Sequence, residues 1–296
     1  MLQTETIIPA FDATKLLVRH YRPTHGKAAR TLLIVHGMAE HVRRYEHIAR
    51  FIVERGWNLV IPDLRGHGRS GGAPTHVRDF RDYVLDMQSV RKHFRLKRRR
   101  TALLGHSMGG LIALRTAQIF PGCAAAMVLM SPLLGLNVPI APWTFTTGRV
   151  LSLLAPRTRF RSKIDPSAST SNPRVIEARM QDPPVNRTVT ARWFFAMRAS
   201  LRAAWAEAEH VRLPLLMMQS GQDRIVDALA SAEWFRSAGS HDKAFHCLEN
   251  NLHELHNEPD WEQTVSMVLD WLEPRMGQTR RPPKLSALGN RIAKAG

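Results

Sequence analysis

The sequence has little cysteine, no long apolar run and no sign of a secretion signal. Only 2 of its 296 residues are cysteines, so a disulfide-stapled scaffold is excluded, and we expect Cys123 and Cys247 to be buried thiols. The longest apolar stretch, residues 122–136, is interrupted by Ser131 and Pro132 and is too short to span a bilayer. No basic segment followed by an apolar one opens the chain, so no signal peptide is expected and a cytoplasmic location is predicted.

Acidic residues are also scarce relative to basic ones. The chain has 25 Asp and Glu against 42 Lys and Arg, for a formal charge of +17, and the basic residues gather in segments 91–100, 157–163 and 275–296. The simplest interpretation is an arginine-rich, solvated surface without a specific partner. Such a surface also attracts anionic lipid, so peripheral membrane contact through segment 91–100 or the last segment is a further expectation. No aromatic-interleaved basic motif accompanies the charge, and no nucleic-acid partner is expected.

Motifs for metals and nucleotides are absent as well. No H-E-x-x-H pattern occurs, since His253 and His256 lie too close for it, and the two cysteines are far apart in sequence. No G-x-x-x-x-G-K-[ST] loop is present. We therefore expect neither a metal nor a cofactor.

Short apolar runs alternate with segments of helical pattern from residue 31 to residue 271, which is typical of βαβ units. The expected strands are 31–36, 58–62, 101–105, 126–131, 214–220 and 243–247, and the expected helices are 45–55, 80–95, 108–119, 229–238 and 259–271. Most strand runs are continuously apolar, as in a parallel sheet covered on both faces. Two earlier segments, 6–9 and 15–21, are expected to form an antiparallel edge. The sequence therefore predicts an α/β fold with a mostly parallel, doubly wound sheet.

Residues 134–210 break this alternation and are rich in proline. A structureless loop of that length is improbable in a compact domain, so we interpret the segment as a helical cap inserted between two strands. An apolar stripe within it includes Trp193, Phe194 and Met197. These side chains either pack the cap on the core or line an acyl pocket, and the two roles are compatible. The predicted organisation is a core of residues 1–133 and 211–274, a cap of residues 134–210 and a loosely ordered basic tail of residues 275–296.

One pentapeptide indicates the chemistry. Gly105-His106-Ser107-Met108-Gly109 reads G-x-S-x-G, follows an expected strand and precedes an expected helix. This context is that of a nucleophile elbow, a sharp turn that exposes a serine hydroxyl at the end of a strand. Side chains at Gly105 or Gly109 would collide with the neighbouring strand or helix. Ser107 is the predicted nucleophile.

A serine nucleophile needs a base, and the base needs an acid to orient it. In chains with this elbow the acid follows the serine and precedes the histidine. Asp223 lies at the end of expected strand 214–220, where active sites of open α/β sheets collect. Asp227 begins the next helix, where an aspartate is a routine N-cap. We predict Asp223 as the acid.

The base is expected after the last strand. His253 lies in the loop that follows it, whereas His246 falls inside the strand and is expected to be structural. His256 is expected further from the chemistry or on the surface, and His106 is a neighbour of the serine rather than the base. We predict His253 as the base.

The oxyanion formed during acyl transfer needs backbone N–H donors. One is expected at Met108, directly after the nucleophile. The other is expected at Met38, in the loop after strand 31–36, where Gly37 allows the backbone and substrate to approach closely. His36 and Glu40 are expected to brace this loop.

Five motifs occur in order along residues 31–271: His36-Gly37-Met38-Ala39-Glu40-His41, Asp63-Leu64-Arg65-Gly66-His67-Gly68-Arg69-Ser70, Gly105-His106-Ser107-Met108-Gly109-Gly110, Gly221-Gln222-Asp223-Arg224 and His253-Glu254. Together they resemble the monoacylglycerol lipase and lysophospholipase branch of the α/β-hydrolases, the serine aminopeptidase S33-like set. The resemblance implies Ser107, Asp223 and His253 as the triad, with Met38 and Met108 as oxyanion donors. The basic segments 91–100 and 275–296 are not features of this branch.

The expected activity is hydrolysis of carboxylic esters with one long acyl chain, such as monoacylglycerols or lysophospholipids, through an acyl-enzyme. A general carboxylesterase or thioesterase would use the same triad. A catalytically silent binding protein of this fold would have lost a triad member, and none is lost here.

Overall fold

The computed structural model describes residues 1–25, 28–137, 142–161, 165–182 and 188–276. Among these residues, eight strands form one sheet in the order β1-β2-β4-β3-β5-β6-β9-β10. The strands are β1 Leu2–Pro9, β2 Lys15–Arg22, β3 Thr31–Val35, β4 Asn58–Pro62, β5 Thr101–His106, β6 Ala126–Met130, β9 Leu215–Ser220 and β10 Lys243–Leu248. β1 and β2 pair antiparallel, as do β2 and β4, and the other pairs are parallel. The predicted α/β fold with a mostly parallel sheet and an antiparallel edge is confirmed.

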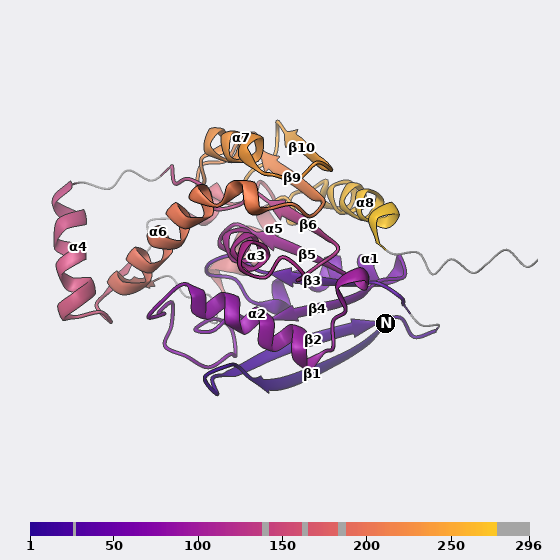
Figure 1. Cartoon of the computed structure of the whole chain (residues 1–296), viewed down its shortest axis with the longest axis horizontal. Helices are drawn as coiled ribbons and strands as arrows, with labels where there is room; N and C mark the ends of the chain where they lie inside the picture. The colour runs from indigo at the N-terminus through magenta and orange to yellow at the C-terminus, as the bar shows by residue number, and fades with distance from the viewer. Residues whose placement is uncertain (26–27, 138–141, 162–164, 183–187, 277–296) are drawn as a thin grey trace, which may run out of the picture.

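Helices cover both faces of the sheet (Figure 1). The core helices are α1 Glu46–Glu54, α2 Arg81–His93, α3 Met108–Ile119, α7 Ala228–Ser237 and α8 Trp261–Leu272, and short 3-10 turns occur at Val42–Tyr45, Arg98–Arg100, Pro166–Ala168, Ala208–His210 and Glu273–Arg275. Successive residues of β5 belong to two different apolar clusters. Leu103 belongs to the cluster that includes residues of α2, α3 and α7, whereas Ala102 and Leu104 belong to the cluster that includes residues of α1 and α8. Because both faces are buried, the strands have no polar alternation, which is why they appeared as continuous apolar runs.

In the segment between β6 and β9, the described residues form the α-helices α4 Pro142–Leu154, α5 Pro173–Met180 and α6 Ala191–Ala206. It also contains an antiparallel strand pair that the sequence did not predict, β7 Arg159–Arg161 with β8 Thr188–Thr190. α6 packs on α3 of the core and on α4, and α4 lies at the end of the molecule furthest from α8 (Figure 1). None of the helices in the described part of the chain combines the length and apolar character needed to cross a bilayer.

The prediction for the cysteines is half wrong. Both are free, and Cys123 is buried, but Cys247 is exposed. Cys247 lies in β10, which forms one edge of the sheet within the described part of the chain. His246, in the same strand, is exposed as well. The expected loosely ordered tail falls mostly on residues 277–296, which lie outside the described residues.

Candidate active site

Ser107 lies at the tip of the turn between β5 and α3. Its backbone has φ 53° and ψ −120°, a conformation that costs energy for a residue with a side chain. Neighbouring segments hold it there: the N–H of Ser107 donates to the Met130 carbonyl at 3.1 Å, and its carbonyl accepts from the Leu133 N–H at 2.9 Å. The side chain remains partly exposed, as a nucleophile requires.

The glycines of the pentapeptide are required by contact. A Cβ on Gly105 would lie 2.3 Å from the carbonyl oxygen of Gly109, and a Cβ on Gly109 would lie 2.0 Å from that of Val35. Neither distance is compatible with a side chain. The helix therefore approaches β3 and β5 as closely as the elbow prediction requires.

Asp223 and His253 form a buried pair. Oδ2 of Asp223 accepts from Nδ1 of His253 at 2.7 Å, and Oδ1 accepts the N–H groups of Ile225 and Val226 at 2.9 Å each. Burial raises the pKa of the Asp223 carboxyl, but the hydrogen bond and charge of His253 outweigh it, so this pKa lies below its ordinary value. The charged carboxylate fixes the tautomer of His253 with its proton on Nδ1, which leaves Nε2 as a base. Asp227 instead caps α7 by accepting the Leu229 and Ala230 N–H groups, the alternative role expected for it.

Three loops meet around Ser107. The ring of His106, the residue before it, lies 4.8 Å from the ring of His253, centre to centre. A Cβ on Gly37 would lie 3.2 Å from the Cβ of Ser107. The loop after β3 therefore lies against Ser107, the loop after β10 lies against the residue before it, and His253 contacts Asp223 in the loop after β9. All four loops lie at the carboxyl ends of parallel strands, where ligands bind in such sheets.

The proposed oxyanion donors occupy suitable backbone positions. Met108 is the first residue of α3, so its N–H has no acceptor within the helix. Met38 follows Gly37 in a loop that is braced as expected. Nδ1 of His36 donates to the Gly37 carbonyl at 2.7 Å, while Oε2 of Glu40 accepts the Gly37 N–H at 3.0 Å. Burial lowers the pKa of His36 to about 4, so the ring remains neutral in this role.

The apolar residues of the cap divide between two environments. Trp193 is buried, and its indole N–H donates to the hydroxyl of Tyr83 in α2 at 3.1 Å. Met197 is also buried in the core shared with α2 and α3, whereas Phe194 is only partly buried. Trp193 and Met197 therefore join the cap to the core, and contact with a substrate stays a prediction for all three.

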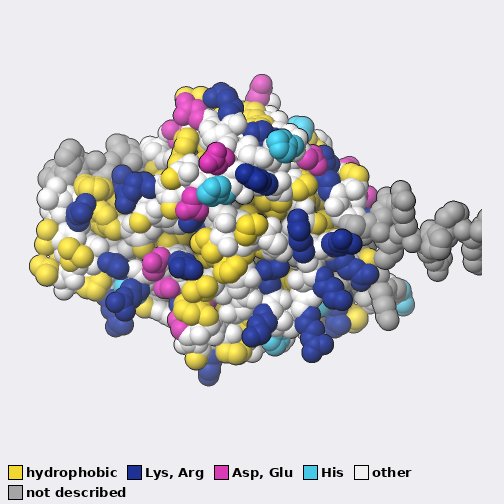
Figure 2. All heavy atoms as spheres, viewed as in Figure 1, with side chains coloured by type: hydrophobic (Ala, Val, Ile, Leu, Met, Phe, Trp, Pro, Cys, Tyr) yellow, Lys and Arg dark blue, Asp and Glu magenta, His cyan; other side chains and the backbone are white. Residues whose placement is uncertain are grey.

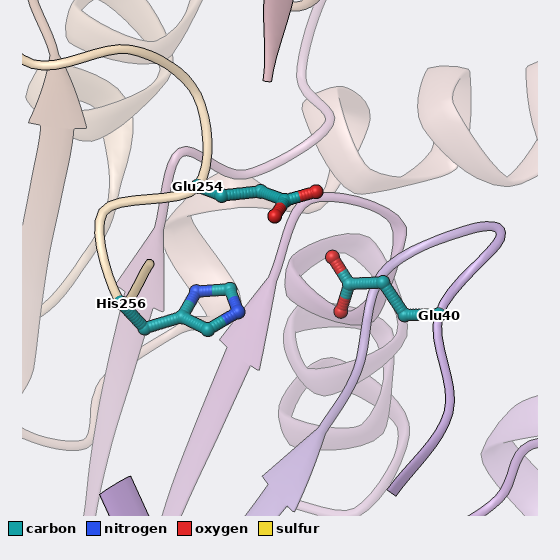
Figure 3. Close-up of side chains that lie close together, drawn as sticks. All are labelled: Glu40, Glu254 and His256. Atoms are coloured by element: carbon teal, nitrogen blue, oxygen red, sulfur yellow. The ribbon is translucent and has the colours of Figure 1, made fainter. Parts of the chain in front are cut away.

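A group of buried polar residues behind His253 was not predicted. Figure 3 shows the carboxylates of Glu254 and Glu40 facing one another, with the ring of His256 beside them, and ligand atoms of all three lie within 4.8 Å of one another. His256 was expected further from the chemistry or on the surface. It is buried and stacks on the ring of Tyr45 at 4.7 Å, and burial lowers its pKa to about 3.

Glu254 is neutralised by arginines. Oε1 accepts from Arg179 at 2.5 Å, and Oε2 accepts from Arg44 at 3.0 Å and from the Asn257 amide at 2.7 Å. Burial raises the pKa of the Glu254 carboxyl, but the two arginine charges outweigh it, so this pKa is lowered. Glu254 stands beside the predicted base in the sequence, but its two arginine partners lie 75 and 210 residues away, so the sequence does not indicate these ion pairs.

Glu40 is engaged as well. Its Oε2 accepts the Tyr45 hydroxyl at 2.5 Å, and its Oε1 lies 3.3 Å from Nε2 of His106. Burial raises the pKa of Glu40, but the His106 charge outweighs it and the result is well below the ordinary value. Because a cation at Glu40, Glu254 and His256 would compete with two arginines for Glu254, the donor set fits an ion-pair network and not a metal centre.

A family model described as "Serine aminopeptidase, S33" matches residues 26–260. Phospholipase YtpA of Bacillus subtilis is 32% identical over 233 residues, which cover 78% of this chain and 90% of the relative. Human monoglyceride lipase is 31% identical over 283 residues, which cover 92% of each chain.

Solved structures share the fold. Paleococcus ferrophilus monoacylglycerol lipase superposes with a TM-score of 0.80 at 23% identity, covering 88% of this chain and 99% of the other. A soluble variant of monoglyceride lipase from Saccharomyces cerevisiae, in complex with a substrate analog, superposes with a TM-score of 0.79 at 19% identity, covering 94% and 96%.

Proposed function

The chain belongs to the serine aminopeptidase S33 family of hydrolases, and we propose that it cleaves carboxylic esters of lipids with a single acyl chain, such as monoacylglycerols or lysophospholipids. One observation carries the proposal: the buried Asp223–His253 pair lies against the elbow that presents Ser107. The relatives support the substrate class, since two that share about a third of their residues with this chain are named as a phospholipase and a monoglyceride lipase.

In the proposed reaction, Oγ of Ser107 attacks the ester carbonyl carbon while Nε2 of His253 takes the hydroxyl proton. The N–H groups of Met38 and Met108 stabilise the negative oxygen that develops. The C–O bond to the alcohol then breaks, and His253 gives its proton to the leaving alcohol oxygen. Water, deprotonated by His253, attacks the acyl carbon, the bond from that carbon to Oγ of Ser107 breaks, and His253 returns its proton to Oγ, which releases the fatty acid and free Ser107.

Turnover of a monoacylglycerol, a lysophospholipid, a short nitrophenyl ester and an acyl thioester by the purified protein tests this assignment. We expect the single-chain lipid esters to give the highest kcat/KM, and Ser107→Ala to abolish turnover of all four. A fluorophosphonate probe should label Ser107 in the wild type. Preference for the short ester or the thioester would instead indicate a general carboxylesterase or a thioesterase, and absence of labelling would contradict catalysis altogether.

We further propose that the cap contacts anionic membrane surfaces. Val150, Leu153 and Leu154 share one face of α4 and are 49%, 69% and 81% exposed. Residues 149–161 also contain four arginines and no acidic residue. Hydrophobic and basic side chains accordingly lie together at the α4 end of the molecule (Figure 2). Such a surface suits an interface of apolar chains and anionic headgroups.

The basic segment 91–100 is placed less favourably for bringing a membrane lipid to Ser107. Segment 91–100 directly precedes β5, so it lies at the amino ends of the parallel strands, opposite the carboxyl ends that carry Ser107. Docking through it would turn the catalytic end away from the bilayer.

Co-sedimentation with anionic and neutral vesicles tests the membrane contact. Leu153→Glu should weaken binding to anionic vesicles, whereas Leu229→Glu, a change at a 77% exposed leucine on α7, should not. Equal binding to neutral and anionic vesicles would contradict a role for the arginines.

A further inference from the structure

Helix α5 of the cap lies against the loop that carries the predicted base. The helix begins at Pro173 after Asn172, whose side chain accepts the Arg174 N–H as an N-cap. Just before it, residues 169–171 follow the loop of residues 251–258 through a series of hydrogen bonds. The Glu254 N–H donates to the Ser169 carbonyl at 2.6 Å, and the Thr170 hydroxyl donates to the Asn257 carbonyl at 3.1 Å.

The same segment also binds the far side of this loop. The N–H and the hydroxyl of Ser171 donate to the two carboxylate oxygens of Glu258, at 2.6 and 3.0 Å. Oε2 of Glu258 also accepts the N–H of Leu252, the residue before His253, at 3.2 Å. The backbone on both sides of His253 is therefore fixed through contacts that involve the cap.

Arg179, near the end of α5, makes the one charged contact between this helix and the loop among the described residues. A single atom, Nη1, donates both to Oε1 of Glu254 at 2.5 Å and to the hydroxyl of Ser169 at 2.6 Å. The side chains of Arg179 and Glu254 are 10% and 2% exposed, so this pair is nearly withdrawn from solvent. In such surroundings an ion pair is directional and is screened by salt much less than a pair at the surface.

We propose that Arg179 is a positioning residue for His253, acting through Glu254. This role rests on the proposed function, because it concerns how the base of that reaction is held. Glu254 follows His253 directly, and its carboxylate is fixed from the core by Arg44 and from the cap by Arg179. With the Asp223 bond on the ring and the Glu254 contacts on the adjoining residue, His253 is restrained at both its side chain and its backbone. A displacement of about 1 Å in a reacting group can lower a rate by roughly a hundredfold, so the loss of one restraint has a catalytic effect.

A purely structural role for Arg179 makes a different prediction. If the pair only attached the cap, its loss would lower thermal stability or raise KM for long-chain esters, which depend on the cap. Chemistry on a small ester, and reaction of Ser107 with a small probe, would continue at the wild-type rate. A short ester and a fluorophosphonate therefore separate the two roles.

The experiment compares Arg179→Met and Arg179→Lys with Arg174→Met, an exposed arginine of the same helix, as the matched control. Each variant is measured for the rate of fluorophosphonate labelling of Ser107, for kcat and KM with 4-nitrophenyl acetate, and for thermal unfolding. We expect Arg179→Met to lower kcat and the labelling rate by about tenfold or more, with KM within about twofold. Arg179→Lys should retain at least about a third of the wild-type rates, because both contacts come from one nitrogen that an ammonium can replace.

Wild-type labelling and kcat in Arg179→Met would overturn the proposal, whatever happens to its melting temperature. If Arg179→Met does not fold, Glu254→Gln provides the test. It keeps the shape of the side chain and both arginines but removes the negative charge of the Glu254 carboxylate. A fall of about tenfold in its labelling rate supports the proposal, and a wild-type rate refutes it. If the wild type itself showed no labelling, the proposed function would fail and not the placement of Arg179.

Discussion

His253 and Asp223 share a hydrogen bond of 2.7 Å between Nδ1 and Oδ2, and their side chains are 5% and 0% exposed. The second oxygen of Asp223 is held by two backbone N–H groups, so the carboxylate cannot turn away from the ring. The pair thus gives His253 one tautomer and one orientation before any substrate binds.

Asp223→Asn should lower kcat by on the order of 10⁴-fold with little change in fold. An amide has the size of the carboxylate, but its NH₂ group facing Nδ1 favours the wrong tautomer of His253. The measurement is kcat with a nitrophenyl ester, normalised to the concentration of folded protein.

Asp227→Asn is the matched control for that change. Asp227 lies four residues away and only caps α7, and asparagine is an equally good cap, so both kcat and stability should remain close to wild type. Equal losses of kcat in the two variants would contradict the assignment of Asp223 as the acid.

The triad candidates were predictable because the order of serine, acid and base along the chain follows from the fold. Ser107 directly follows β5, Asp223 and His253 lie in the loops after β9 and β10, and α3 was expected and found at residues 108–119. What remained hidden depends on tertiary contact. Nothing near Arg179 in the sequence indicates that it meets Glu254, and the short strands β7 and β8 are paired across the cap without an apolar pattern of their own.

Gly109→Ala tests the close approach of α3 to β3. The added Cβ would lie 2.0 Å from the Val35 carbonyl oxygen, so the backbone must shift, and a loss of unfolding free energy of about 1–3 kcal/mol or more is expected. Gly122→Ala is the control, because a Cβ there meets no heavy atom within 4 Å. Urea unfolding of both variants measures the difference, and similar midpoints for the two would contradict the contact.

Trp193→Phe tests whether this residue joins the cap to the core. The change removes the N–H that donates to the Tyr83 hydroxyl, and an unsatisfied buried group costs about 1–3 kcal/mol. A double-mutant cycle with Tyr83→Phe should give a coupling energy of about 1 kcal/mol in unfolding. A coupling energy near zero, together with a rise in KM for long-chain esters only, would instead indicate that Trp193 lines the acyl pocket.

Stability should fall on mild acidification because several histidines are buried in neutral form. Burial lowers the pKa of His36 and of His67 to about 4 and that of His256 to about 3. An unfolded histidine has a pKa of about 6.5, so below this pH these histidines bind protons in the unfolded chain but not in the folded one. The stabilisation from these groups is complete above pH 6.5 and is lost progressively as the pH falls toward 4. The pKa of His106 shifts in the opposite direction. Burial lowers it, but the charge of Glu40 and its hydrogen bond outweigh burial, so the pKa is raised.

Between pH 6 and pH 5 we expect each of His36, His67 and His256 to lower the free energy of unfolding by about 1 kcal/mol. His20, whose pKa burial also lowers to about 4, acts in the same direction, whereas Asp86, whose pKa burial raises to about 6, acts in the opposite one. His106 offsets little in this interval, since it is protonated in both states. Urea unfolding at pH 7, 6 and 5 measures the slope, and His67→Gln should reduce the fall between pH 6 and pH 5 by about 1 kcal/mol, because this group no longer titrates. An identical slope in the variant and the wild type would show that His67 binds its proton equally in both states, contrary to its burial.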